Sequence, residues 1–158
     1  MASVTRLQRV AVMERIQQIL EAASTDPELS IVQGPPRNPQ QGKLIVVGSD
    51  VTGELSVAHL TAGRKSYDDV FDVELLCIAW DPGAESHQWS DLDCEQIAEL
   101  IRDTVADRPR LEAVIGGDGM DGVVAAMLAN LDGPSRWWNP EGVGTAMRLT
   151  INIHVRID

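Results

Sequence analysis

The feature that most constrains this sequence is a strict alternation of apolar and polar residues along its last twelve positions, 147–158. The apolar members are Leu149, Ile151, Ile153, Val155 and Ile157, and the polar members between them are Arg148, Thr150, Asn152, His154 and Arg156. Because successive side chains of a strand point to opposite faces, the pattern predicts one apolar face and one polar face. This is typical of an antiparallel sheet with one face on the core. The polar face carries its charged groups as a ladder and not as a catalytic cluster.

Two amphipathic helices are predicted from apolar residues at helical spacing. The first covers about 5–23, and its stripe consists of Val12, Met13, Ile16, Ile19, Leu20 and Ala23. Leu7 and Val10 lie off this stripe, either because the helix end is frayed or because they form a second contact face. The second helix is predicted to start at Ser90, which forms a capping-box pattern with Asp93, and to end at Pro109. Its stripe consists of Cys94, Ile97, Ala98, Ile101 and Val105.

Strand patterns fill most of the remaining sequence. Strands are expected at 29–33, 43–48, 54–61, 70–80, 123–131 and 147–158, with helix as a live alternative for 123–131. Turn-forming residues predict loops at 34–42, 49–53, 62–66, 81–89 and 132–144. The order of elements predicts an α+β fold, in which two main helices pack on a mostly antiparallel sheet of about five to six strands. We expect residues 1–158 to form a single domain.

The charge balance bears on possible partners. The chain has 24 acidic and 13 basic side chains, a formal net charge of −11. This disfavours stable nucleic-acid binding, which needs Lys and Arg to neutralise phosphates; it is equally typical of an acidic soluble protein. Cys77 and Cys94 are expected to be buried thiols of a reduced compartment. We expect no signal peptide and no membrane span, since no apolar run approaches the required length of about 20 residues.

A glycine-rich segment, Gly116–Gly122, matches one copy of a nonapeptide calcium repeat. Calcium in that motif is held between stacked copies, so a lone copy cannot complete the oxygen shell. His59, His87 and His154 lack the clustered spacing of zinc ligands. We therefore expect no metal and no cofactor.

Catalytic motifs are weak in this sequence. The residues Ser86, His87, Ser90 and Asp91 supply the letters of a catalytic triad within one short segment, whereas triad members normally come from separate elements. There is no phosphate-binding glycine loop. We expect no catalytic residue and no enzymatic activity.

Tryptophan accounts for four of the six aromatic residues. Trp137 and Trp138 are adjacent, and successive side chains of an extended chain cannot both point into one core. One ring is therefore expected at the surface, where tryptophan is a common interface anchor. The alternative is that the loop folds back and covers both rings.

Taken together, these elements resemble the tail terminator proteins of long-tailed bacteriophages. The resemblance rests on five features in order along the chain: the helix ending at Ala23, the proline-rich loop before Leu44–Val47, the strand Val70–Trp80, the capped helix after Asp81–Gly83, and the stretch from Trp137–Pro140 to Arg148–Ile151. It covers most of the chain. The segment Gly116–Gly122 is not part of the resemblance.

The resemblance implies a structural virion protein without catalytic residues, assembled in the host cytoplasm. It would form a homo-oligomeric ring, expected to be a hexamer, that caps the tail tube, stops its growth and joins the filled head. The implied partners are the tail tube protein and a head-tail connector or stopper protein, with genomic DNA passing through the lumen without specific binding. Trp137, Trp138, Leu7 and Val10 are the expected contact residues. The alternatives are another neck component, or a small cytoplasmic ligand-binding or enzymatic domain.

Overall fold

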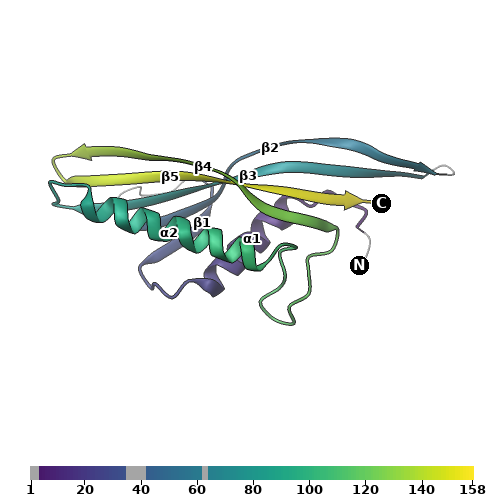
Figure 1. Cartoon of the computed structure of the whole chain (residues 1–158), viewed down its shortest axis with the longest axis horizontal. Coiled ribbons are helices and arrows are strands. Elements are labelled where there is room, and N and C mark those ends of the chain that lie inside the picture. Colours follow the sequence, from purple (N-terminus) through teal and green to yellow (C-terminus); the bar gives the residue numbers. More distant parts are fainter. Residues whose placement is uncertain (1–3, 35–41, 62–63) are drawn as a thin grey trace.

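Five strands form one sheet in the order β1-β2-β3-β5-β4, and two helices cover one of its faces (Figure 1). The computed structural model describes residues 4–34, 42–61 and 64–158. The elements are α1 (Arg9–Ala23), β1 (Leu29–Gln33), β2 (Lys43–Thr61), β3 (Arg64–Pro82), α2 (Gln88–Asp107), β4 (Val123–Asn139) and β5 (Gly142–Ile157). All neighbouring strands are antiparallel except β1 and β2, which run parallel. The predicted α+β class and mostly antiparallel sheet are confirmed.

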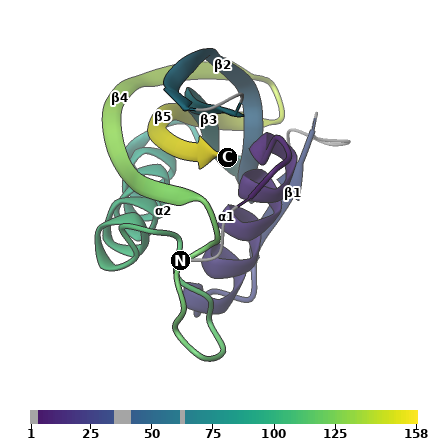
Figure 2. The same ribbon diagram turned by 90° about the vertical axis from the view of Figure 1, so that its right-hand side faces the viewer.

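The core lies between the helices and the apolar face of the sheet. The alternation that opens the sequence analysis is confirmed in β5, where Leu149, Ile151, Ile153, Val155 and Ile157 are all buried. The alternating residues Phe71, Val73, Leu75, Cys77 and Ala79 of β3 are buried beside them. The stripe predicted for α2 is buried in full, and α1 buries Val12, Ile16, Ile19 and Leu20. Viewed end-on, α1 lies toward the β1 edge and α2 toward the β4 edge (Figure 2).

Strands β2 and β3 form a hairpin longer than the sequence predicts. The turn expected at 49–53 does not form, because residues 50–57 pair with 67–74 of β3. The register shifts between Val47 and Asp50, where the chain forms a bulge. Gly48 takes φ +75° there, a conformation that glycine adopts readily. Gly53 packs directly on Phe71 of the opposite strand, and a side chain at this position would collide with it. The end of this hairpin projects beyond the helices (Figure 1).

The loop expected at 132–144 is also wrong. Strand β4 continues to Asn139 with a register shift between Asp132 and Ser135, and only Pro140 and Glu141 separate it from β5. Glycine and proline are tolerated here because β4 is an edge strand. Trp137 and Trp138 therefore lie in a strand and not in a loop.

The helix boundaries differ from the prediction at their starts. Helix α1 begins at Arg9, four residues later than expected, and Leu7 precedes it. Helix α2 begins at Gln88, before Ser90, and has His87 at its N-cap position. Within the described residues, neither helix has the length and apolar character that a membrane crossing requires.

Candidate functional site

The two adjacent tryptophans of β4 point to opposite faces of the sheet. Trp137 is half-buried on the face away from the helices, where it lies against Gly144 and stacks on Trp80 with ring centroids 6.4 Å apart. It contributes to a second apolar cluster, whose buried members are Leu44, Val46 and Ile78. Its ring therefore covers apolar surface of its own chain.

Trp138, in contrast, is 77% exposed. It borders a groove of about 470 Å³ at the end of the molecule that carries the β4–β5 turn and the start of α2. The groove is lined by Gly83, Ala84, Glu85, His87, Trp138, Asn139, Pro140 and Val143. Trp89, in the first turn of α2, is also 60% exposed. We call this end of the molecule the tryptophan end.

A network of polar side chains ties α2 to this end of the sheet. The Arg136 guanidinium donates two hydrogen bonds to Asp91, at 3.1 and 2.6 Å, and the Thr145 hydroxyl donates a third at 2.7 Å. Burial raises the pKa of Asp91, but the bonds from Arg136 and Thr145 outweigh this and leave it below its ordinary value. These bonds hold the ionised Asp91 carboxylate in place and connect α2 to β4 and β5 next to Trp138.

The residues with triad letters do not form a nucleophile and base pair. His87 Nε2 lies 3.0 Å from the Trp137 carbonyl oxygen, and the buried Ser90 hydroxyl donates to the His87 carbonyl and contacts Thr145 Oγ1 at 2.8 Å. A nucleophile and base pair needs a hydrogen bond between the serine hydroxyl and the histidine ring. Here the Ser90 hydroxyl and the His87 ring bond to other partners. The cap predicted for Ser90 and Asp93 is likewise wrong, because α2 has no side-chain cap hydrogen bond. Ser86 instead accepts a bond from the Gln88 backbone.

The other two predicted contact residues lie far from the tryptophan end. Leu7 is 65% exposed and Val10 64% exposed, just before and at the start of α1. Their neighbour Arg9 donates two hydrogen bonds to the fully buried Asp69, at 3.0 and 2.7 Å, and lies over the Phe71 ring. Asp69 pairs with Val155 of β5, and Trp137 pairs with Gly144 of the same strand. These two β5 residues are eleven positions apart, which corresponds to about 36 Å along the strand. The structure therefore separates the two predicted contact regions.

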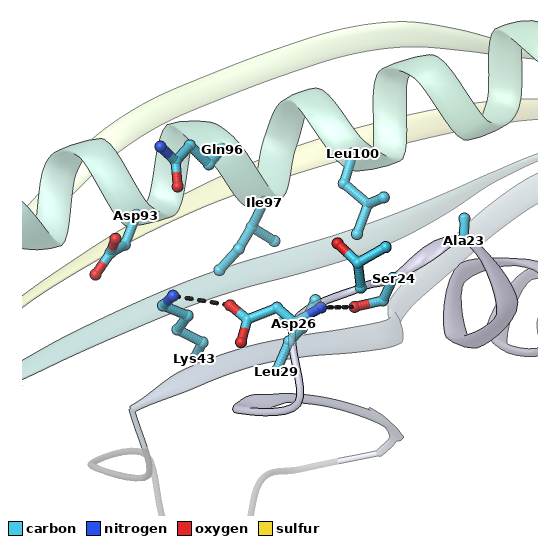
Figure 3. A pocket seen from close by; sticks show the side chains of 10 residues that line it. Ala23, Ser24, Asp26, Leu29, Lys43, Asp93, Gln96, Ile97 and Leu100 are labelled. Carbon is cyan, nitrogen blue, oxygen red and sulfur yellow. Dashed lines mark hydrogen bonds and ion pairs between the residues drawn. The ribbon is translucent and has the colours of Figure 1, made fainter.

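A smaller pocket of about 190 Å³ lies between the end of α1, α2 and the start of β2 (Figure 3). Lys43 in its floor donates to Asp26 at 2.8 Å, and Asp93 and Gln96 approach from α2. The hydrogen bond with Asp26 raises the pKa of Lys43 and lowers that of Asp26. A nucleophilic lysine needs a lowered pKa, so this pairing suits a structural role.

The face of the sheet away from the helices carries the predicted polar ladder. Arg156 and His154 of β5 contact the same carboxylate, Asp68 of β3, with Nε–Oδ1 and Nε2–Oδ1 distances of 3.0 and 2.8 Å. The hydrogen bond from Arg156, followed by that from His154, lowers the pKa of Asp68. Farther along, Asn152 donates to Asp72. The basic residues of the ladder are thus partners of acidic residues on β3, which the alternation alone did not reveal.

The remaining candidates for reactive or metal-binding groups are dispersed. The described residues contain no group of three or more His, Cys, Asp or Glu side chains that could hold a metal ion. The glycine-rich segment Gly116–Gly122 is irregular, as expected, and the His59 side chain lies outside the described residues. Cys77 and Cys94 are free and buried, and burial raises the pKa of Cys94 to about 12. These thiols are therefore poor nucleophiles at neutral pH.

Sequence reasoning missed three apolar surface features. Leu55 and Val57 are exposed on the projecting hairpin, and Ile115 is 92% exposed beside α1. A groove between α2 and β4 has a floor that includes Ala98, Leu128 and Met147. Only the alternation of Leu55 and Val57 was visible in the sequence, since the other features depend on how distant segments pack.

Comparisons with known proteins identify a shared fold. No family model matches the chain, and no curated protein matches it. Among solved structures, it resembles a chain from the virion of a native gene transfer agent particle, with a TM-score of 0.52 and 13% sequence identity. The match covers 93% of this chain and 91% of that chain. The likeness shows that the two chains share a fold along nearly their whole length.

Proposed function

We propose that this chain is a structural virion protein, the subunit of a tail terminator ring of a long-tailed bacteriophage. The observation that carries the proposal is the full-length fold likeness to a chain of a gene transfer agent virion. It agrees with the family that the sequence resembles. The proposal assigns the chain no enzymatic activity and places it in the virion after assembly in the host cytoplasm.

A ring of six copies needs surfaces for neighbouring subunits and for the structures above and below it. The exposed apolar residues support this, because they lie at both ends of a long molecule: Trp138 and Trp89 at one end, Leu7 and Val10 toward the other. Large exposed aromatic side chains in a rim of polar groups are typical of interface anchors. We assign the tryptophan end to contact with the tail tube protein or with the connector or stopper, with Trp138 as its anchor and Trp137 behind it.

The charge of the chain suits a ring that DNA traverses. Helix α2 carries six acidic side chains, at positions 91, 93, 95, 99, 103 and 107, and one basic side chain, Arg102. An acidic surface repels phosphates and so permits DNA to pass without specific binding. The net charge of −11 gives the same tendency to the subunit as a whole.

The decisive experiment is binding to tail tubes. The purified protein is mixed with tail tubes, pelleted with them, and viewed by negative-stain microscopy. We expect a ring at one end of each tube and an arrest of further growth when tube subunits are added. Absence of tube binding at high protein concentration would reject the terminator role, and binding to the connector alone would assign the chain to another neck component.

A matched pair of variants tests the assigned surface. Trp138→Ala should fold normally and bind tubes at least about tenfold more weakly, as is common for an aromatic anchor. Met127→Ala removes another exposed apolar side chain, on the same strand but outside the tryptophan end, and should bind like wild type. Equal binding by both variants would show that the tube contacts another surface.

A further inference from the structure

We propose that, within the ring, the start of α1 and the adjacent hairpin surface of one copy dock into the groove between α2 and β4 of the next copy. The inference rests on the proposed function and names the two complementary surfaces of the subunit contact. We call them the α1 surface (Arg6, Leu7, Val10, Leu55 and Val57) and the α2–β4 groove.

The α2–β4 groove is an apolar trough with an acidic rim. Its volume is about 310 Å³, and it is lined by Glu95, Ala98, Glu99, Arg102, Leu128, Leu131, Met147 and Leu149. Its floor consists of the buried Ala98, Met147 and Leu149 and the partly buried Leu128, while Leu131 on its lip is half exposed. Glu95 and Glu99 are exposed and form no salt bridge with another described residue, whereas Arg102, the basic residue of the lining, pairs with Asp103. An apolar floor with unpaired acids at the rim fits an apolar ligand surface flanked by cations.

The α1 surface has the opposite character. Leu7 and Val10 expose most of their side chains, and Arg6 beside them is exposed. The first acidic residue of the sequence is Glu14, so the charged side chains that precede it, Arg6 and Arg9, are both basic. Leu55 is the cross-strand neighbour of Asp69, which binds Arg9 of α1. The apolar residues of the hairpin and of α1 thus flank one buried ion pair, which holds them in fixed relative positions.

The placement of the two surfaces favours contact between copies. Helix α1 lies toward one edge of the sheet, and α2 with β4 forms the other edge (Figure 2). A subunit with two different, complementary surfaces on opposite sides associates head to tail, and such contacts form a ring when the rotation between successive copies closes. Both surfaces belong to the same chain, and their charges are complementary. A second copy is therefore the partner that they fit.

Disulfide cross-linking tests the contact directly. The variant Val10→Cys/Leu131→Cys places one thiol on each surface, and the native Cys77 and Cys94 are fully buried and should not react. On oxidation, we expect non-reducing gel electrophoresis to show a ladder of covalent oligomers, whose largest species has the number of copies in the ring. Mixing the two single variants should give only heterodimers of Val10→Cys with Leu131→Cys chains.

Two control pairs make the result specific. Val10→Cys/Met127→Cys uses the opposite face of β4 and should give no ladder. Val10→Cys/Ile115→Cys probes the neighbouring groove between α1 and residues 113–115, and a ladder from this pair alone would overturn the inference. The Val10→Cys/Leu131→Cys variant is oxidised at rising concentration, until light scattering detects assembly or the solubility limit is reached. If no cross-links form over this range, the inference is overturned too.

Charge reversal provides an independent readout in the same assay. Glu99→Lys should weaken association about fivefold, the effect expected of an exposed ion pair. Adding Arg6→Glu to the same chain should restore it to within about twofold. Failure of this rescue would contradict the pairing of the two surfaces. Tube binding remains a separate measurement, so a cross-linked ring that does not bind tubes would reject the terminator role and leave the contact in place.

Discussion

Trp137 stacks on Trp80 across Gly144, with ring centroids 6.4 Å apart and ring planes inclined by 16°. Trp80 and Trp137 lie on the strands that flank β5, and Gly144 is the β5 residue between them. Only glycine leaves room for the Trp137 ring at this point. The adjacent tryptophans of β4 thus differ in role: one ring is packed within the chain and the other is exposed.

The first prediction concerns this stacking. Trp137→Ala should lower the free energy of unfolding by about 3 kcal/mol, because it uncovers the small apolar cluster beneath the ring. Trp138→Ala should change it by less than about 0.5 kcal/mol, the usual range for an exposed position. Urea unfolding of both variants measures the difference. Similar losses would show that Trp138 also packs on the fold.

Gly144→Ala tests the same contact from the other side. A methyl group at this position collides with the Trp137 ring and should displace it into water. We expect a red shift of the tryptophan emission together with a lower urea midpoint. Gly116→Ala is the control, because Gly116 has open space around it and its replacement leaves the Trp137 ring in place. Gly116 has φ +86°, so its replacement strains the backbone and should lower the urea midpoint without shifting the emission. An unchanged spectrum for Gly144→Ala would contradict the stacked arrangement.

The buried carboxylate of Asp69 depends on Arg9. Arg9→Met leaves a fully buried acid without its ionic partner and should cost about 3 kcal/mol, whereas Arg9→Met combined with Asp69→Leu should recover much of that loss. A double-mutant cycle in urea measures the coupling. Arg102, which pairs with Asp103 on the exposed side of α2, is the control, and Arg102→Met should have no measurable effect. Additive losses for the two substitutions would show that the pair contributes nothing.

The Asp68 cluster predicts a specific dependence on pH. The bonds from Arg156 and then His154 hold the pKa of Asp68 below its ordinary value, so the folded protein binds this proton less readily than the unfolded chain. The ionised carboxylate therefore stabilises the fold above about pH 4, and this contribution is lost as the pH falls through the folded pKa. The destabilisation caused by Asp68→Asn should be full at neutral pH and shrink below about pH 4.

Urea unfolding on both sides of that pH measures the effect. Asp121→Asn removes an exposed carboxylate that has no salt bridge with another described residue, and its small effect should not follow the same course. A loss from Asp68→Asn that is constant with pH would exclude the ionic origin.

The last strand supplies a further prediction. Ile153 is fully buried against the helices, whereas its neighbour His154 lies on the other face and contacts Asp68. Ile153→Ala should cost about 2–5 kcal/mol, the range for a large-to-small change in a core. His154→Ala should cost clearly less. Equal losses in thermal or urea unfolding would mean that both faces of β5 are buried.

Patterns that repeat along one element could be read from the sequence. The alternation of β5 and the apolar stripe of α2 each indicate which face of the element is buried. They do so independently of the rest of the chain, because the same pattern of apolar residues recurs at every residue pair of the strand and every turn of the helix. The core residues Ile151 and Ile101 could thus be predicted without knowing their neighbours.

Breaks in a pattern were less reliable guides. Residues 49–53 and 132–144 contain turn formers, yet both segments lie mostly in strands, because pairing with β3 and β5 outweighs local preference. The contact of Trp137 with Trp80, and the groove beside Leu131, arise from segments far apart in the chain. No local pattern encodes such contacts, so they could not be predicted.

Strand β3 has a mechanical consequence of its own. It runs the length of the sheet and is bonded to β2 on one side and to β5 on the other, from Tyr67 to Ala79 on both sides. A pull applied along this axis loads both ladders in shear, so many hydrogen bonds must break together before β3 slides. The molecule should therefore resist stretching between its hairpin and its tryptophan end far better than peeling of β4 from the edge, where bonds can break one at a time.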